Sequence, residues 1–477
     1  MKGVDKMGKI LGAYLFPHPP IILEEIGKGE EKKANKTIEG VRALSRDIAT
    51  KSPSTIILIT PHGPLFRDAV SISIEETLKG DFGGFGHGDI ILEFKNNIKL
   101  VKNIINNSLD EGIMVAEVDK SFAREYGVEA KLDHGALVPL YFVDKESKNY
   151  KLIHITYGLL SPKDLYKFGR AIEKSIVDLD EKVVIISSGD LSHKLSNEGP
   201  YSYSPYGKVF DEAIVNIIKS GSMEDIISFD LELAERAGEC GLRSLMIMAG
   251  IVNKYKLKPE VLSYEGPFGV GYCTAKIDID GTFSPKEPDL LQIIEERKRR
   301  KMDEIRKNES PYVKLARESL EYFIREKRPM NPLLDFSDEL MNVKKGVFVT
   351  LNKDGMLRGC IGTIEPTEPS IGLEIMKNAV AAGTEDPRFD PVEEYELDDI
   401  IYSVDVLSAP EPIKSMEELD VEKYGVIVSL GYRRGLLLPN LEGIDTVEEQ
   451  VSIALSKANI RPDEPYTMER FEVKRYN

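Results

Sequence analysis

Four of the six histidines lie in short phrases rich in proline, glycine, serine and aspartate, which are typical of turns. Two neutral imidazoles and one carboxylate from separate loops can hold Fe(II) on one face and leave the opposite positions for substrate and O2. No histidine follows His193, so imidazole chemistry is expected in the N-terminal part of the chain. The phrases are Pro17-His18-Pro19-Pro20, Pro61-His62-Gly63-Pro64, Asp133-His134-Gly135 and Ser187-Ser188-Gly189-Asp190-Leu191-Ser192-His193.

The predicted metal ligands are His18, His62 and Glu239. Prolines beside both histidines fix the backbone and reduce the entropy that is lost when a loop becomes ordered. Glu239 precedes an apolar helical run and would approach the site from a helix N-terminus. Its neighbour Cys240 could supply a thiolate instead. A carboxylate suits iron with an open face, whereas a thiolate shifts the preference toward softer ions, and the sequence leaves this choice open.

His193 and His134 are predicted to move protons. An imidazole with a pKa near neutrality can take a proton from a bound phenol and return it later. Asp190, three residues before His193, either orients that ring or caps a turn. Ser187 and Ser188 end an apolar run and could hydrogen-bond a substrate oxygen.

The two other histidines are expected to take no part in the chemistry. His154 lies inside a strand-like run, where a hydrogen-bonded core residue is the simplest interpretation. His87 lies in Gly83-Gly84-Phe85-Gly86-His87-Gly88, which we interpret as a mobile, solvated loop.

Strand-like and helical segments alternate through the first 280 residues, which favours an α/β domain with helices flanking a largely parallel or mixed sheet. Ligands of such sheets bind beyond the carboxyl ends of the strands, and three of the histidines directly follow predicted strands. The predicted strands are Gly12 to Phe16, Thr55 to Thr60, Leu152 to Thr156 and Lys182 to Ser187. The predicted helices are Ala34 to Lys51, Ile98 to Leu109, Lys163 to Leu179 and Val209 to Lys219.

A chain of 477 residues exceeds what one hydrophobic core usually supports. The charge-rich stretch 289–301 is typical of a solvated linker helix, and a second globular pattern follows it. We place an α/β domain at 8–282, the linker at 283–308 and a second, α+β domain at 309–477. In the second domain we expect helices at 312–325 and 447–458, strands at 346–351, 400–407 and 426–429, and a segment punctuated by glycine and proline at 355–369.

The formal net charge of −17 would repel phosphate backbones and anionic lipids, which argues against nucleic-acid and membrane partners. A small molecule or a protein is the expected partner. No apolar run is long enough to span a bilayer, and the three cysteines lack metal-finger spacing. We therefore expect a cytoplasmic protein with reduced thiols.

The first 280 residues resemble the class III extradiol dioxygenases of the LigB type and their Memo-like relatives. The resemblance rests on the four histidine phrases in this order and on Gly266-Pro267-Phe268-Gly269-Val270-Gly271-Tyr272. It implies an α/β sandwich in which His18 and His62 bind metal with Glu239, His193 is the acid/base residue and His134 its helper. Memo-like relatives have a cysteine before glycine that matches Cys240.

Residues 309 to 477 resemble the AMMECR family, chiefly through Leu357-Arg358-Gly359-Cys360-Ile361-Gly362-Thr363. The resemblance implies an α+β domain that often accompanies a Memo-like protein and a radical SAM protein. Cys360 has no histidine in its domain to activate it, so we expect a packed cysteine, with Arg358 paired to a carboxylate such as Glu385 or Asp386, and no catalytic role.

The leading hypothesis is a metal-dependent, extradiol-dioxygenase-like oxidoreductase that binds Fe(II), or another divalent metal, and acts with O2 on an aromatic diol or related small molecule. The alternative is a Memo-like metal-binding or interaction protein without ring cleavage, accessory to a radical SAM pathway. A third possibility is hydrolysis or modification of a small metabolite in such a pathway.

Overall fold

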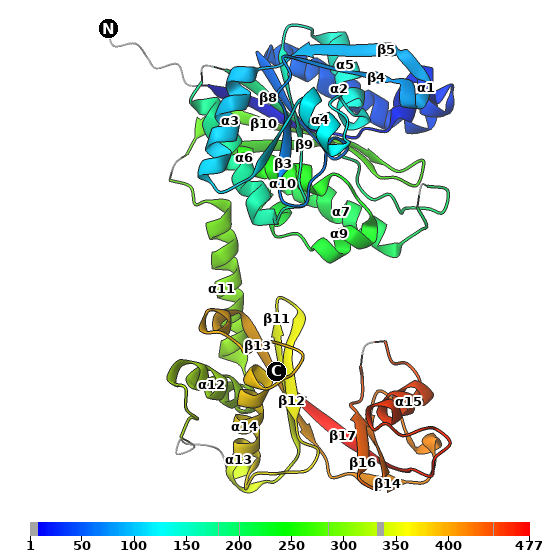
Figure 1. Cartoon of the computed structure of the whole chain (residues 1–477), viewed down its shortest axis with the longest axis vertical. Helices are drawn as coiled ribbons and strands as arrows, with labels where there is room; N and C mark the ends of the chain where they lie inside the picture. Colours follow the sequence, from blue (N-terminus) through cyan, green and yellow to red (C-terminus); the bar gives the residue numbers. More distant parts are fainter. Residues whose placement is uncertain (1–7, 180, 200, 285, 332–337, 442) are drawn as a thin grey trace. The chain divides into compact units, whose positions relative to one another are not determined.

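The computed structural model describes residues 8–179, 181–199, 201–284, 286–331, 338–441 and 443–477 (Figure 1). The chain divides into two compact units, of which the first ends at Glu296 and the second begins at Arg297. The division falls within helix α11 (Leu290–Asn308), which contains the charge-rich stretch.

The first unit is built on an eight-stranded mixed sheet in the order β6-β3-β7-β2-β8-β1-β10-β9. Strands β1, β8, β2 and β7 are neighbours and run parallel, whereas β10 and β9 pair antiparallel beyond β1. The sequence prediction of an α/β domain with a largely parallel or mixed sheet is confirmed. The strands are β1 Lys9–Phe16, β2 Thr55–Thr60, β3 Val70–Ser73, β6 Val115–Val118, β7 Lys151–Thr156, β8 Lys182–Ser188, β9 Tyr255–Glu265 and β10 Tyr272–Phe283.

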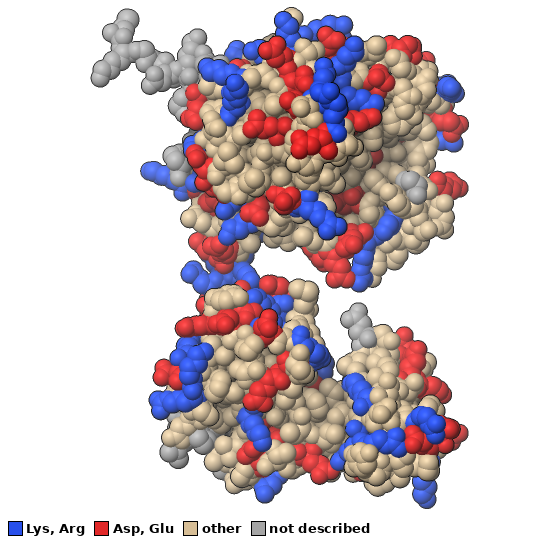
Figure 2. Space-filling model, viewed as in Figure 1, with Lys and Arg blue, Asp and Glu red and all other residues tan. Residues whose placement is uncertain are grey.

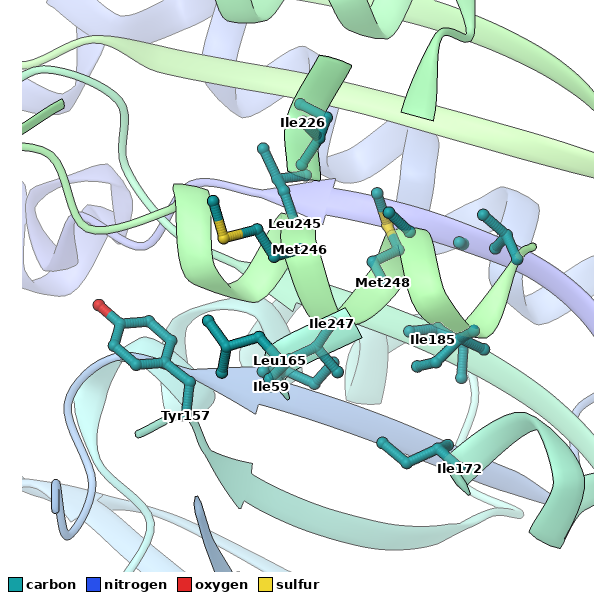
Figure 3. Packing of buried hydrophobic residues seen from close by; sticks show 14 of the residues in the cluster. Ile59, Tyr157, Leu165, Ile172, Ile185, Ile226, Leu245, Met246, Ile247 and Met248 are labelled. Carbon is teal, nitrogen blue, oxygen red and sulfur yellow. The ribbon is translucent and has the colours of Figure 1, made fainter. Parts of the chain in front are cut away.

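Helices cover both faces of this sheet. Successive residues of a strand point to opposite faces, so a strand buried on both sides is apolar throughout. In β2, Ile57 and Ile59 join one hydrophobic cluster with α3, α6 and α10, while Ile56 and Leu58 join a second cluster with α2 and α5. Figure 3 shows part of the first cluster, in which side chains of α10, α6 and the sheet pack together. The helices are α1 Glu24–Gly27, α2 Asn35–Lys51, α3 Ile98–Asp110, α4 Lys120–Tyr126, α5 His134–Glu146, α6 Pro162–Val177, α7 Pro205–Ser220, α8 Met223–Ile227, α9 Leu231–Ala237 and α10 Leu242–Ile251.

A separate two-stranded hairpin, β4 (Thr77–Phe82) and β5 (His87–Lys95), corrects the prediction for the glycine-rich phrase. Residues Gly83–Phe85 form a 3-10 turn and His87 begins β5, so the phrase forms the turn of a hairpin and His87 belongs to a strand. Gly86 has a φ of 83°, in the left-handed region that glycine adopts without strain.

The second unit contains a seven-stranded antiparallel sheet in the order β12-β11-β13-β17-β15-β16, with β14 paired to β17. Helices α12 and α14 pack on the β11–β13 part through one cluster, and α15 packs on β15 through another. The predicted α+β class is confirmed, but β12 lies within the segment that the sequence assigned to turns. The elements are α12 Pro311–Glu326, α13 Asp338–Asn342, β11 Val347–Lys353, β12 Met356–Gly362, α14 Ile371–Thr384, β13 Ile400–Leu407, β14 Glu411–Ile413, β15 Tyr424–Leu430, β16 Arg433–Leu437, α15 Val447–Lys457 and β17 Thr467–Tyr476.

Acidic and basic side chains are interleaved on the face of each unit shown in Figure 2. Many of them pair across short distances, as Lys276 does with Glu260 and Arg434 does with Glu365. Within the part of the chain that the structure describes, every helix is too short or too polar to cross a membrane.

Candidate metal centre

Three adjacent parallel strands deliver the predicted site residues to one edge of the sheet. The register pairs Phe16 at the end of β1 with Ser188 at the end of β8, and Ile59 near the end of β2 with Ser187. The loops that follow therefore begin at the same level. His18, His62 and Asp190 lie in these loops, beyond the carboxyl ends of the strands, as the sequence predicts.

The side chains of His18, His62 and Cys240 converge, with one potential ligand atom from each lying within 4.8 Å of the others. The Nε2 atoms of the two histidines are 3.0 Å apart, and Cys240 Sγ lies 3.6 Å from His18 Nε2. Ligand atoms bound at about 2.0–2.3 Å from one ion, at right or tetrahedral angles, lie roughly 3–3.6 Å from one another. The two distances from His18 Nε2 match this spacing, and the three side chains together have the donor chemistry of a metal site.

The tautomer of His18 suits ligation through Nε2. Ser188 Oγ donates its proton to the Gly135 carbonyl oxygen at 2.5 Å and lies 2.9 Å from His18 Nδ1. Since a serine hydroxyl has a single proton, Oγ must accept from Nδ1–H, and the Nε2 lone pair is left free. Such a partner on the far nitrogen is characteristic of metal-binding histidines.

Asp190 and Cys240 lie beside the His18 ring, and all three residues are buried. Asp190 Oδ1 accepts the His18 backbone N–H at 2.9 Å, and the Asp190 N–H lies 3.3 Å from Cys240 Sγ. Burial raises the pKa of Asp190 to about 6 and that of the Cys240 thiol well above its usual range. Burial also lowers the pKa of His18 and of His62 to about 3. Burial around His18 thus disfavours every uncompensated charge, and a bound cation would allow a thiolate to persist there.

A close approach of two loops sets the position of Cys240. A Cβ atom on Gly189 would lie 2.2 Å from the Cα of Gly241, so a side chain at this position would force the two loops apart. Asp190 and Cys240 are the neighbours of these two glycines in sequence, and glycine at both positions therefore allows their contact.

The Glu239 carboxylate lies with the first turn of α10. Its Oε2 accepts the Leu242 N–H at 2.6 Å, and the charge of Arg243 acts on it. Burial raises the pKa of Glu239 to about 7. The sequence left either Glu239 or Cys240 as the third ligand. The group that converges with His18 and His62 contains Cys240.

His134 lies against His62 at the start of α5. Their ring centroids are 4.2 Å apart with nearly parallel planes. Asp133 is the N-cap of this helix, and its carboxylate also accepts the Thr60 hydroxyl at 2.7 Å. Its other oxygen lies 2.9 Å from Nε2 of His154, the buried strand residue that the sequence set aside. Although burial opposes it, the hydrogen bond from His154 holds the pKa of Asp133 well below its usual range.

His193 belongs to the same charged neighbourhood. Burial lowers its pKa, against the opposing effect of Asp190, so the imidazole is neutral at pH 7. Its ring is parallel to that of Tyr201, with centroids 5.8 Å apart. His87 lies outside the site, with Nδ1 3.9 Å from the carboxylate of exposed Asp89.

Sequence reasoning missed several residues around this site. Ser188 was assigned to a substrate oxygen but hydrogen-bonds His18 instead. Asp133 carried a usable signal, because aspartate before a helical run is a typical N-cap. Phe85 and Tyr201, which contact His134 and His193, have no sequence pattern that would have identified them.

In the second unit, the charged residues around Cys360 pair differently from the expectation. Arg358 forms its ion pair with Glu396, at 2.9 Å, because β12 runs beside the turn that contains Glu396. Asp386 instead pairs with Arg388 and accepts the Cys360 backbone N–H at 2.8 Å. Arg358 thus pairs with a carboxylate, as the sequence indicates, but the partner is Glu396 and not Glu385 or Asp386.

Comparisons with known proteins divide the chain in the same way. Residues 12–275 match the family model described as the catalytic LigB subunit of aromatic ring-opening dioxygenase, and residues 313–477 match the AMMECR1 model. A Clostridium acetobutylicum protein is 45% identical over 98% of both chains. A Thermotoga maritima protein is 54% identical over 35% of this chain and 98% of its own length. The crystal structure of an uncharacterized protein from Pyrococcus horikoshii has 34% identity, covers 34% of this chain and 88% of its own, and has a TM-score of 0.33.

Proposed function

Since the chain belongs to the LigB family of aromatic ring-opening dioxygenases and carries an AMMECR1 domain, we propose that its first unit is a metal-dependent, extradiol-dioxygenase-like oxidoreductase. Its substrates would be O2 and a small aromatic diol or related molecule. The observation that carries the proposal is the convergence of His18, His62 and Cys240 at the carboxyl edge of the sheet, where His18 and Cys240 are buried and His62 is exposed.

In this proposal His18 Nε2, His62 Nε2 and Cys240 Sγ hold the metal. Iron(II) is the favoured ion because the family acts on O2, and the mixed nitrogen and sulfur donors also suit other divalent metals. When bound, a redox-active ion would supply Lewis acidity and pass electrons between the ring and O2. Ser188 keeps His18 in the correct tautomer, and Asp190 fixes the loop through the His18 backbone.

Proton transfer is assigned to His193. Its depressed pKa makes it neutral at pH 7, and a neutral imidazole can accept the proton of a substrate hydroxyl and return it. His134 is assigned as its helper, held at the N-terminus of α5 by Asp133. Both rings are only partly buried, so both can reach a bound molecule.

Metal analysis of anaerobically purified, full-length protein tests the site. We expect His18→Ala and Cys240→Ala to lower bound iron to background. Glu239→Gln is the matched control, because a glutamine side chain still accepts the Leu242 N–H. Iron that is lost in Glu239→Gln and retained in Cys240→Ala would reassign the third ligand, and unchanged metal in all three variants would refute the site.

Oxygen uptake by the iron-loaded protein with catechol and protocatechuate tests the reaction. We expect uptake above that of the His18→Ala protein. His193→Ala should retain iron and lose roughly 10²- to 10⁴-fold of kcat, the usual contribution of a general base. Iron binding without oxygen uptake on any vicinal diol would refute the dioxygenase.

Cys240 favours a second candidate. A thiol in place of the carboxylate of the predicted set matches Memo-like relatives, which suggests a metal-binding or interaction protein without ring cleavage, accessory to a radical SAM protein. Preferential retention of zinc or copper over iron in the metal analysis, together with no oxygen uptake, would favour this role.

A further inference from the structure

Two half-exposed aromatic side chains lie against the two histidines that do not ligate metal in the proposed site. Phe85 is 43% exposed, and its ring meets that of His134 at a centroid distance of 5.6 Å. Tyr201 is 55% exposed and stacks in parallel on His193 at 5.8 Å. The two residues come from different elements, the β4–β5 turn and the segment between β8 and α7.

The hairpin holds Phe85 in place from both sides. Phe82, three residues earlier, is fully buried and packs edge-on against Tyr141 of α5, and Phe94 of β5 is also buried. Phe85 alone of these three phenylalanines faces solvent, on a turn that its neighbours anchor. A large apolar ring in water is unfavourable, and its fixed place beside a functional histidine suggests that a ligand covers it.

Hydrogen bonds also hold the segment that contains Tyr201. The Ser204 N–H donates to the Lys194 carbonyl oxygen at 2.9 Å, and the Leu195 N–H donates to the Gly269 carbonyl oxygen at 3.0 Å. The Tyr203 N–H donates to Asn197 Oδ1 at 2.9 Å. These bonds hold the ends of the segment, so the tyrosine ring is presented beside His193 by a bonded loop.

We propose that Phe85 and Tyr201 are specificity-determining residues that pack on the ring of the bound substrate and select planar aromatic molecules. The inference rests on the proposed function of the same site. Aromatic rings attract one another in stacked or edge-on arrangements, beyond the effect of buried area, by roughly two- to tenfold in affinity for each pair. Phe85 lies against His134 and Tyr201 lies against His193, so each of the two side chains would make a separate contact with the substrate ring.

Binding of 4-nitrocatechol to the iron-loaded, full-length protein without O2 tests this role, since the visible absorption of the probe reports binding without turnover. We expect Phe85→Ala and Tyr201→Ala each to raise Kd roughly tenfold with unchanged iron content. Phe85→Leu, which keeps most of the apolar volume but not the flat ring, should give an intermediate value. Tyr432→Ala, at a 97% exposed tyrosine of the second unit, is the control and should bind as the wild type does.

The inference would be overturned if the wild-type protein bound the probe and both alanine variants bound it with the same Kd as the wild type. It would also be overturned if the wild-type protein held iron but did not bind the probe. Weakened binding in the variants of a protein that consumes no O2 with catechols would support the inference while refuting the dioxygenase. The binding experiment can therefore refute the role of Phe85 and Tyr201, and the oxygen-uptake experiment the dioxygenase, each without the other.

Discussion

Replacement of Ser188 by alanine is expected to weaken metal binding without removing a ligand. In the wild type, Ser188 Oγ accepts from His18 Nδ1 at 2.9 Å and donates to the Gly135 carbonyl oxygen at 2.5 Å, where His18 is only 2% exposed. Without the hydroxyl, Nδ1–H loses its partner and the tautomer with a protonated Nε2 becomes competitive. Loss of such a partner typically costs 10- to 100-fold in metal affinity, or about 1.4–2.8 kcal/mol.

The assay is a competition between the protein and a chelator for Fe(II), and separately for Zn(II), under anaerobic conditions. Ser187→Ala is the matched control, because Ser187 is equally buried in the same strand and its hydroxyl has no hydrogen-bond partner among the described residues. The unpaired Gly135 carbonyl in Ser188→Ala should also cost about 1–3 kcal/mol of folding stability, which denaturant unfolding measures separately.

A folded Ser188→Ala protein that binds both ions as tightly as Ser187→Ala would refute this reasoning. It would mean either that His18 ligates through another atom or that it does not ligate. Weaker Zn(II) and Fe(II) binding in both serine variants would instead indicate a general packing effect in β8.

Two further predictions concern folding. Gly189→Ala should destabilise the first unit by about 1–3 kcal/mol and weaken metal binding, because the added Cβ would meet Gly241. Thermal unfolding measures the loss of stability. Gly84→Ala is the control, because a Cβ at Gly84 meets open space and no change in stability is expected. In the second unit, hydrogen bonding to Arg358 lowers the pKa of Glu396 from 4.5 to about 2, which corresponds to roughly 3 kcal/mol. That stability is present above about pH 4.5 and is lost as the pH falls toward 2, so Glu396→Gln should speed hydrogen exchange of β12 at neutral pH and differ less from wild type near pH 2. An equal difference at both pH values would contradict this assignment.

The strands that carry the site were predictable because they are buried on both faces. In Thr55–Thr60, four consecutive apolar residues lie between two threonines, and the strand ends directly before a histidine phrase, so the sequence predicts both the strand and the loop that follows it. β9 was not predicted, because it is an edge strand that alternates polar and apolar residues and contains Pro259, which a sheet tolerates mainly at its edge. β12 was hidden by its glycines, of which Gly359 lies against the Ala382 carbonyl of α14.

The aromatic neighbours of the histidines could not be predicted for a different reason. The contact of Phe85 with His134 joins residues from a hairpin and a helix that no local pattern relates. Likewise, the bond from Ser188 to His18 depends on the register of β1 against β8. Local patterns predict which loops meet at a sheet edge, whereas contacts among their side chains depend on tertiary packing.

The orientation of Glu239 and Cys240 follows from the start of α10. The N-cap of this helix is Gly241, which has no side chain to accept the amide hydrogens of the first turn. Glu239 takes that role through the Leu242 N–H, which directs its carboxylate toward the helix, while Cys240 Sγ lies beside His18 Nε2. A serine or aspartate N-cap would remove the need for Glu239 at the helix and free its carboxylate. The glycine that permits close contact with Gly189 therefore also favours sulfur over oxygen as the third donor of the proposed site.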